Sequence, residues 1–192
     1  MEQTKQSDKA RLGAMGEMMV VVKLMEHGWD AFNANCTIKN YKSVDVVCLN
    51  SGLKESTELW WKPQTALIQV KTCLQKNIPA GFSIDQCLDR SLLEKMVKGP
   101  YVFVYAVKKE NDYTFRYFII SRKEIIDLLY AGHNWYRNMW YREKDIVGYS
   151  PACLSVKWLS GMDEPENVKH GAFINPLNGV SCEDCWENIW KN

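Results

Sequence analysis

Three polar side chains stand inside two short apolar stretches of the sequence. Asp45 interrupts the stretch 43–47, and Gln69 and Lys71 interrupt the stretch 66–72. Successive side chains of a β-strand point to opposite faces, so Gln69 and Lys71 must emerge on the same face. An unpaired polar group in a buried strand costs roughly 1–3 kcal/mol. We therefore expect these three groups to meet partners, and to meet them at one place.

A carboxylate, an amide oxygen and an ammonium group that converge can hold a hard divalent cation beside a positive charge. Mg²⁺ prefers oxygen ligands in near-octahedral geometry and usually keeps several water molecules. A divalent cation neutralises the negative charge that develops during phosphodiester cleavage and lowers the pKa of a coordinated water. This combination of residue types is typical of a metal-dependent phosphodiesterase.

One predicted helix precedes these stretches. It covers residues 7–27 and ends at Gly28, where a left-handed backbone conformation is favoured. Its apolar residues recur at helical spacing and form one stripe: Ala14, Met18, Val21, Val22 and Met25. Glu17 lies at the border of that stripe, so we expect it to lean over whatever the stripe covers.

The remaining elements alternate between strands and helices. Five strands are expected from their apolar, β-branched and aromatic content: 29–36, 41–49, 65–73, 101–107 and 113–120. The stretch 50–64, between the second and third strands, is predicted to be a long hairpin connection. The last two strands are predicted to form a hairpin with each other. A helix over 89–98 ends before Gly99, and a capping box at Ser121 and Glu124 opens a helix that ends near Gly132.

This order of elements and these residues resemble the PD-(D/E)XK nuclease superfamily, in its Holliday-junction-resolvase-like and type IV restriction endonuclease branch. The matching pieces are Gly13-Ala-Met-Gly-Glu17, Val44-Asp45-Val46 and Gln69-Val70-Lys71. The resemblance implies an α/β fold with an αβββαβ core, in which helices flank a mixed central sheet. That core would cover residues 1–130, and 131–192 would be a C-terminal extension packed on the same domain.

The resemblance also implies roles for individual residues. Asp45, the Gln69 side chain and the Val70 backbone carbonyl would hold Mg²⁺ or Mn²⁺, and Lys71 would act on the attacking water and the phosphate. Glu17 would hold a water on the metal or ligate a second ion. Gln69 stands where many members have a carboxylate, which removes one negative charge from the metal site and makes Glu17 more important.

DNA is the expected partner, and a homodimer would suit the cutting of two strands, although no interface is legible in the sequence. Two other classes stay open. Gln69 is also compatible with a catalytically inactive module that binds DNA or another protein. Cys182 and Cys185 are compatible with a thiol or zinc accessory protein, but structural zinc needs four ligands and no further donors lie at a recognised spacing. Two semi-buried thiols is the better interpretation of that pair.

Bulk composition adds modest constraints. The net charge of the 192 residues is +1, which weighs mildly against broad, unspecific coating of nucleic acid. No stretch approaches the roughly 18 apolar residues of a membrane span, so no membrane partner is expected. Seven cysteines without a regular framework or an export signal predict reduced thiols in a cytoplasmic protein. The aromatic segment 134–142 suits base stacking or helix packing, and packing is favoured.

Overall fold

The computed structural model describes residues 2–36, 43–50, 64–110, 112–140, 150–167 and 171–191. Its centre is a five-stranded sheet with the strand order β1-β2-β3-β5-β6. The strands are β1 (Asp30–Asn33), β2 (Val46–Asn50), β3 (Gln64–Cys73), β5 (Tyr101–Lys109) and β6 (Asp112–Ile120). Neighbouring strands are antiparallel except β3 and β5, which are parallel. The α/β class with a mixed central sheet is confirmed, and so is the hairpin of the last two predicted strands.

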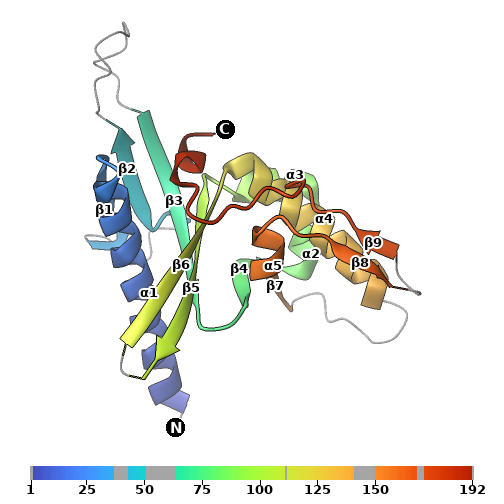
Figure 1. Cartoon of the computed structure of the whole chain (residues 1–192), viewed down its shortest axis with the longest axis horizontal. Coiled ribbons are helices and arrows are strands. Elements are labelled where there is room, and N and C mark those ends of the chain that lie inside the picture. The colour runs from blue at the N-terminus through green and yellow to red at the C-terminus, as the bar shows by residue number, and fades with distance from the viewer. Residues whose placement is uncertain are drawn as a thin grey trace, which may run out of the picture.

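Helix α1 (Glu2–Glu26) lies along one face of the sheet at β1, β2 and β3 (Figure 1). Beneath it is a core that includes Val20 and Leu24 of the helix and Ile68 and Val70 of β3. Gly28 has a φ of 81°, and its N–H donates to the carbonyl of Met25, as the sequence predicted for the residue that follows the helix.

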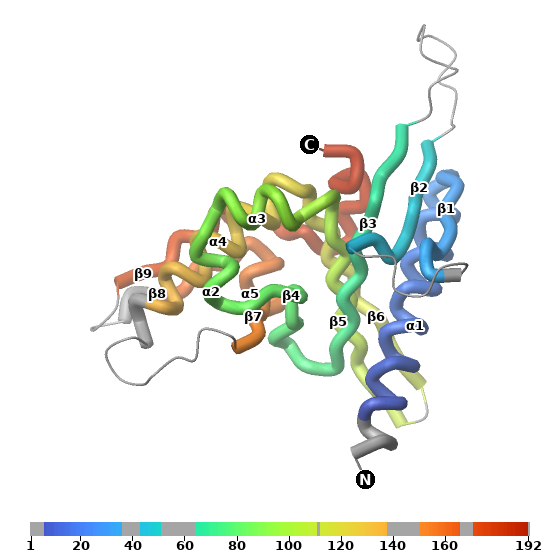
Figure 2. Tube along the Cα trace, turned by 180° about the vertical axis from the view of Figure 1, so that it is seen from behind, coloured from blue at the N-terminus to red at the C-terminus, as the bar shows by residue number. Residues whose placement is uncertain are grey.

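A second layer packs on the other face of the sheet, against β5 and β6. Its core includes Tyr101 and Phe103 of β5 and Phe118 and Ile120 of β6. The elements of this layer are β4 (Asn77–Ser83), α2 (Ile84–Cys87), α3 (Arg90–Met96), α4 (Arg122–Trp140), β7 (Pro151–Ser155), α5 (Val156–Leu159), β8 (Glu164–Asn167) and β9 (Gly171–Phe173). Figure 2 shows this layer on the side of β5 and β6, away from β1 and β2.

The C-terminal segment returns to the central sheet. The short helix η2 (Trp186–Trp190) places Trp186 in the core under α1, and the Asn188 side chain donates to the carbonyl of Ile119 at 2.8 Å. Residues after 130 therefore contact both the core under α1 and the second layer. The expected division at residue 130 falls inside α4.

The prediction for the buried face of α1 was wrong. Met18, Val22 and Met25 are 64%, 46% and 58% exposed, whereas the helix buries Gly16, Val20 and Leu24. A Cβ on Gly16 would overlap the side chain of Thr72 on β3, so this glycine permits the helix to lie close to the sheet. Close backbone approach decided which face is buried, and hydrophobicity alone predicted the opposite one.

Several element boundaries also differ from prediction. The first strand stops at Asn33 and continues as the short helix η1 (Ala34–Cys36). Helix α4 runs past Gly132 to Trp140. Gly132 does not end the helix; it lies so close to the ring of Trp158 that a side chain there would overlap it. The strand β4 and helix α2 between the third strand and α3 were not predicted. Most of the predicted hairpin connection, residues 51–63, lies outside the described residues.

Candidate active site at the fork of β2 and β3

Asp45 lies where strands β2 and β3 separate. Its backbone N–H still donates to the Ile68 carbonyl at 2.9 Å, next to the last ladder pair of β2 and β3, Val46 with Ile68. Beyond this pair a side chain replaces the backbone, because Oδ2 of Asp45 accepts a hydrogen bond of 2.8 Å from the N–H of Val70. The carboxylate of Asp45 therefore has a structural role at the fork, in addition to any chemical one.

Gln69 and Lys71 lie on the face of β3 that points away from α1. The side chains of Ile68 and Val70 are buried under α1, and those of Gln69 and Lys71 alternate with them and are half-buried. Gln69 pairs with Tyr101 on the neighbouring strand, whose ring belongs to the core of the second layer. Both polar side chains therefore share the face of Tyr101, as the sequence predicted from their spacing.

Asp45 belongs to this same face. Val46 points into the core under α1, so the residue before it points the other way. Asp45 lies beside the segment 68–70 of β3, because its N–H donates to the Ile68 carbonyl and its Oδ2 accepts from the Val70 N–H. The pKa of the buried Tyr101 hydroxyl is raised, first by burial and then by the negative charge of Asp45, which is consistent with a carboxylate near this ring. The structure thus brings Asp45, Gln69 and Lys71 to one face of the sheet.

The Val70 carbonyl points toward the same fork. In a β-strand the N–H and C=O of one residue point to the same side of the chain. Because the N–H of Val70 reaches Asp45, its carbonyl oxygen also lies on the Asp45 side, beyond the last paired residues of β2. The backbone oxygen that the sequence analysis assigned to a cation is on the side that this assignment requires.

Lys71 extends across a glycine of the second layer. A Cβ on Gly81 of β4 would lie 3.2 Å from Cε and 3.7 Å from Nζ of Lys71. Gly81 has a φ of 89°, and the register of β4 with β7 shifts on either side of it, between Pro79 and Ser83. Gly81 was not among the predicted site residues. A glycine inside a strand often marks a bulge or a close approach, and that was the available signal.

Glu17 lies on the α1 side of the sheet and is connected to Asp45 through two asparagines. The Asn33 side chain donates to Oε2 of Glu17 at 2.6 Å, and its Oδ1 accepts from the backbone N–H of Asn35 at 2.7 Å. The Asn35 side chain in turn donates to Oδ1 of Asp45 at 3.5 Å, the longest contact of the series. Glu17 is therefore not on the face of Gln69 and Lys71. Neither asparagine was among the predicted site residues, although both lie within the predicted first strand 29–36.

The donor set at the fork consists of oxygen atoms. Each carboxylate oxygen has two lone pairs, so Asp45 keeps acceptor capacity after its bonds to Val70 and Asn35. With the Gln69 amide oxygen and the Val70 carbonyl, these donors fit Mg²⁺ or Mn²⁺, which complete their coordination with water. Within the described part of the chain, no group of three or more His, Cys, Asp or Glu side chains could hold a metal.

The cysteine pair near the C-terminus has the properties of structural thiols. Cys182 is buried, and burial is the main cause that raises its pKa to about 12. A thiol with this pKa is protonated near neutral pH, which opposes a role as a nucleophile. The Cys185 thiol donates to the carbonyl of Ser181 at 3.3 Å. Both thiols are free.

The aromatic segment 134–142 has a packing role at Trp135. The Trp135 ring lies 5.6 Å from the Phe173 ring and 6.2 Å from the Trp158 ring, between centroids. This contact fixes the second half of α4 against β9 and α5. The last two residues of the segment lie outside the described residues.

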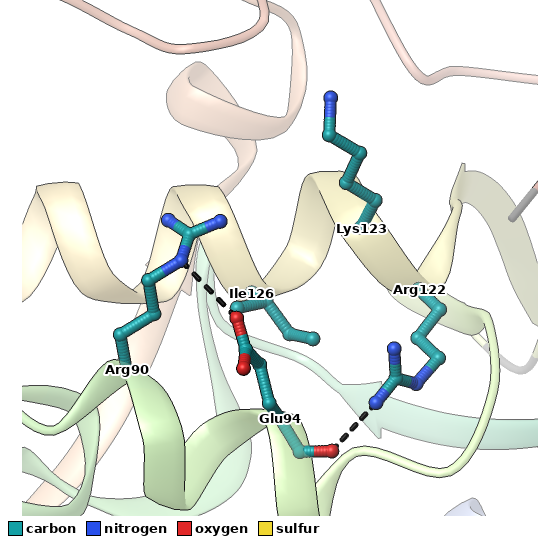
Figure 3. Close-up of a pocket in the computed structure, with 5 residues that line it drawn as sticks. All are labelled: Arg90, Glu94, Arg122, Lys123 and Ile126. Atoms are coloured by element: carbon teal, nitrogen blue, oxygen red, sulfur yellow. Dashed lines mark hydrogen bonds and ion pairs between the residues drawn. The ribbon is translucent and has the colours of Figure 1, made fainter.

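A separate pocket of about 170 Å³ lies between α3 and α4 and is lined by Arg90, Glu94, Arg122, Lys123 and Ile126 (Figure 3). Its two arginines are engaged within the protein. Arg90 pairs with Glu94 at 3.3 Å, and the Arg122 guanidinium donates to the carbonyls of Glu94 and Val97 at 2.5 and 2.9 Å. The Arg122 bonds tie the end of α3 to the start of α4, so we assign the pocket a structural role.

Comparison of the chain with protein-family models, with curated proteins and with solved structures finds no match. The family resemblance therefore stays a prediction, and the geometry at the fork is what bears on function. None of the helices in the described part of the chain is both long and apolar enough to cross a membrane.

Proposed function

We propose that this chain is a Mg²⁺-dependent nuclease-like domain of the PD-(D/E)XK type that hydrolyses DNA phosphodiester bonds. The observation that carries the proposal is the arrangement at the fork, where Asp45, Gln69 and Lys71 share one face of the sheet. The element order supports it as well. Helix α1, the antiparallel strands β1 to β3, helix α3 and the parallel strand β5 follow the order of the resembled core, with β4 and α2 inserted.

Each residue at the fork has a chemical task in this proposal. Asp45, the Gln69 amide oxygen and the Val70 carbonyl hold the cation, and when bound it supplies a Lewis acid that offsets negative charge on the phosphate. Lys71 binds a phosphate oxygen and stabilises the charge that grows there as water attacks. Glu17 is a positioning residue, because it acts on Asp45 only through Asn33 and Asn35.

Cleavage of DNA tests the proposal. Supercoiled plasmid and branched DNA are incubated with the protein in Mg²⁺, in Mn²⁺ and in EDTA. We expect cleavage with either metal, none in EDTA, and loss of activity in Asp45→Asn and Lys71→Ala. Lys108→Ala is the matched control, because Lys108 is an exposed lysine of β5 away from the fork. Equal cleavage by wild type, Asp45→Asn and Lys71→Ala would overturn the proposal.

A catalytically inactive DNA-binding module of the same fold is the second candidate. Gln69 leaves one carboxylate on the face of Lys71, and both oxygens of that carboxylate already accept hydrogen bonds. This lowers the negative charge available to a divalent cation. DNA binding that persists without any Mg²⁺ or Mn²⁺ binding would favour this candidate.

A further inference from the structure

Among the residues that the structure describes, none forms a second layer over β1, β2 and the first half of β3 on the face away from α1. The second layer packs against β5 and β6, and β1, β2 and the first half of β3 lie outside it (Figure 2). Side chains on this open face are correspondingly exposed. Phe32 of β1 is 51% exposed and Leu67 of β3 is 41% exposed, although both belong to the central sheet.

Three apolar side chains form one row across this open face. Phe32 lies opposite Val47 of β2, and Val47 lies opposite Leu67 of β3. Residues directly opposite each other in antiparallel strands have side chains on the same face, and adjacent strands are about 4.8 Å apart. The row is therefore about 10 Å long, with an aromatic ring at the edge strand. We call Phe32, Val47 and Leu67 the apolar row.

The apolar row adjoins the candidate active site on the same face. Gln69 is two residues after Leu67 and so lies about 7 Å further along β3. Asp45 lies beside this part of β3, because its carboxylate accepts from the Val70 N–H. Lys71 follows two residues beyond Gln69. The face thus presents, in succession, a flat apolar surface, the oxygen ligands of the candidate cation and a positive charge.

This succession has the chemistry of one nucleotide, whose flat base is joined through the sugar to a charged phosphate. An aromatic side chain can stack on any base, because every base has a π-face. In a duplex those faces are covered by neighbouring bases, so only an unpaired base can lie on Phe32. With the proposed nuclease function as its premise, we infer that the substrate carries an unpaired nucleotide next to the phosphate that is cut. Its base stacks on Phe32, and Val47 and Leu67 form the rest of the surface.

Binding in EDTA tests this inference without cleavage. Fluorescein-labelled oligothymidylate is the single-stranded probe, and a labelled blunt-ended duplex of two fully complementary strands of the same length is the comparison, both followed by anisotropy. Wild type should bind the single strand more tightly than the duplex. Phe32→Ala should weaken single-strand binding roughly 5- to 150-fold, the effect of losing about 1–3 kcal/mol of stacking. It should leave duplex binding unchanged, and Phe32→Trp should restore the single-strand affinity.

Met18→Ala is the matched control, because Met18 is 64% exposed on the opposite side of the sheet, on the outer surface of α1. Equal single-strand affinity of Phe32→Ala and wild type, or a wild-type preference for the duplex, would overturn the inference. Circular dichroism and thermal melting show whether the variants stay folded, as expected for a side chain that is half exposed.

The outcomes separate this inference from the proposed function. Phe32-dependent binding of the single strand without cleavage in Mg²⁺ would contradict the nuclease proposal and support the base-binding surface. Cleavage in Mg²⁺ with single-strand binding that does not depend on Phe32 would support the nuclease proposal and overturn the base-binding surface.

Discussion

The double role of Asp45 predicts a difference between its two simplest substitutions. Asp45→Ala removes the acceptor of the 2.8 Å bond from the Val70 N–H and leaves that donor partly buried and unpaired. Such a loss costs about 1–3 kcal/mol of the free energy of unfolding. The contact with Asn35 adds little, because it is 3.5 Å long. Asp45→Asn keeps a carbonyl oxygen in the same place and loses only the charge assistance, roughly half the strength of the bond.

Thermal melting and urea unfolding at neutral pH measure this difference. For a chain of this size, each kcal/mol lowers the melting temperature by about 2–4 °C. We therefore expect Asp45→Ala to melt roughly 2–12 °C below wild type, and Asp45→Asn to lose about half as much. The dependence of the unfolding free energy on urea concentration should be the same in all three proteins. An Asp45→Ala protein as stable as wild type would refute the assignment of Asp45 to the fork. Equal destabilisation by both substitutions would refute the argument from the retained acceptor.

Three further predictions concern neighbouring groups. Gly81→Ala places a methyl group 3.2 Å from Cε of Lys71, at a backbone φ of 89°. DNA cleavage should fall, while the protein stays folded with a free energy of unfolding lower by about 1–2 kcal/mol. Unchanged cleavage would contradict this placement of Lys71. Gln69→Glu adds a second carboxylate at the fork and should tighten Mg²⁺ binding, measured by calorimetry, roughly tenfold or more. An unchanged affinity would contradict the role of the residue 69 side chain as a ligand. Burial lowers the pKa of His133, so the unfolded chain takes up a proton first as the pH falls below about 6.5 and stability declines from there. His133→Gln should flatten that decline in urea unfolding between pH 7 and pH 5, and an equally steep decline would refute it.

The elements that depend on local residue patterns could be predicted from the sequence. The hairpin of β5 and β6 was predicted from its β-branched and aromatic residues, and the capping box was confirmed by the bond of 3.1 Å from the Ser121 N–H to Glu124. The shared face of Gln69 and Lys71 followed from strand alternation alone.

The features that were missed depend on contacts between distant segments. The buried face of α1 is decided by the approach of Gly16 to Thr72, which are far apart in the chain. Strand β4 contains Pro79 and Gly81, residues that argue against a strand by propensity, and its pairing with β7 overrides them. The connection from Glu17 to Asp45 through Asn33 could not be predicted, because asparagines at a strand end usually read as turn residues.

The measurement that tests the central claim most directly is a calorimetric titration of Mn²⁺ into the wild-type protein and Asp45→Asn. The claim is that the fork of β2 and β3 holds a divalent cation through Asp45 and the oxygens of Gln69 and Val70. We predict saturable binding by wild type and its loss in Asp45→Asn, while both proteins stay folded. Absence of binding by wild type, or equal binding by Asp45→Asn, would contradict the claim and leave Asp45 with its structural role alone.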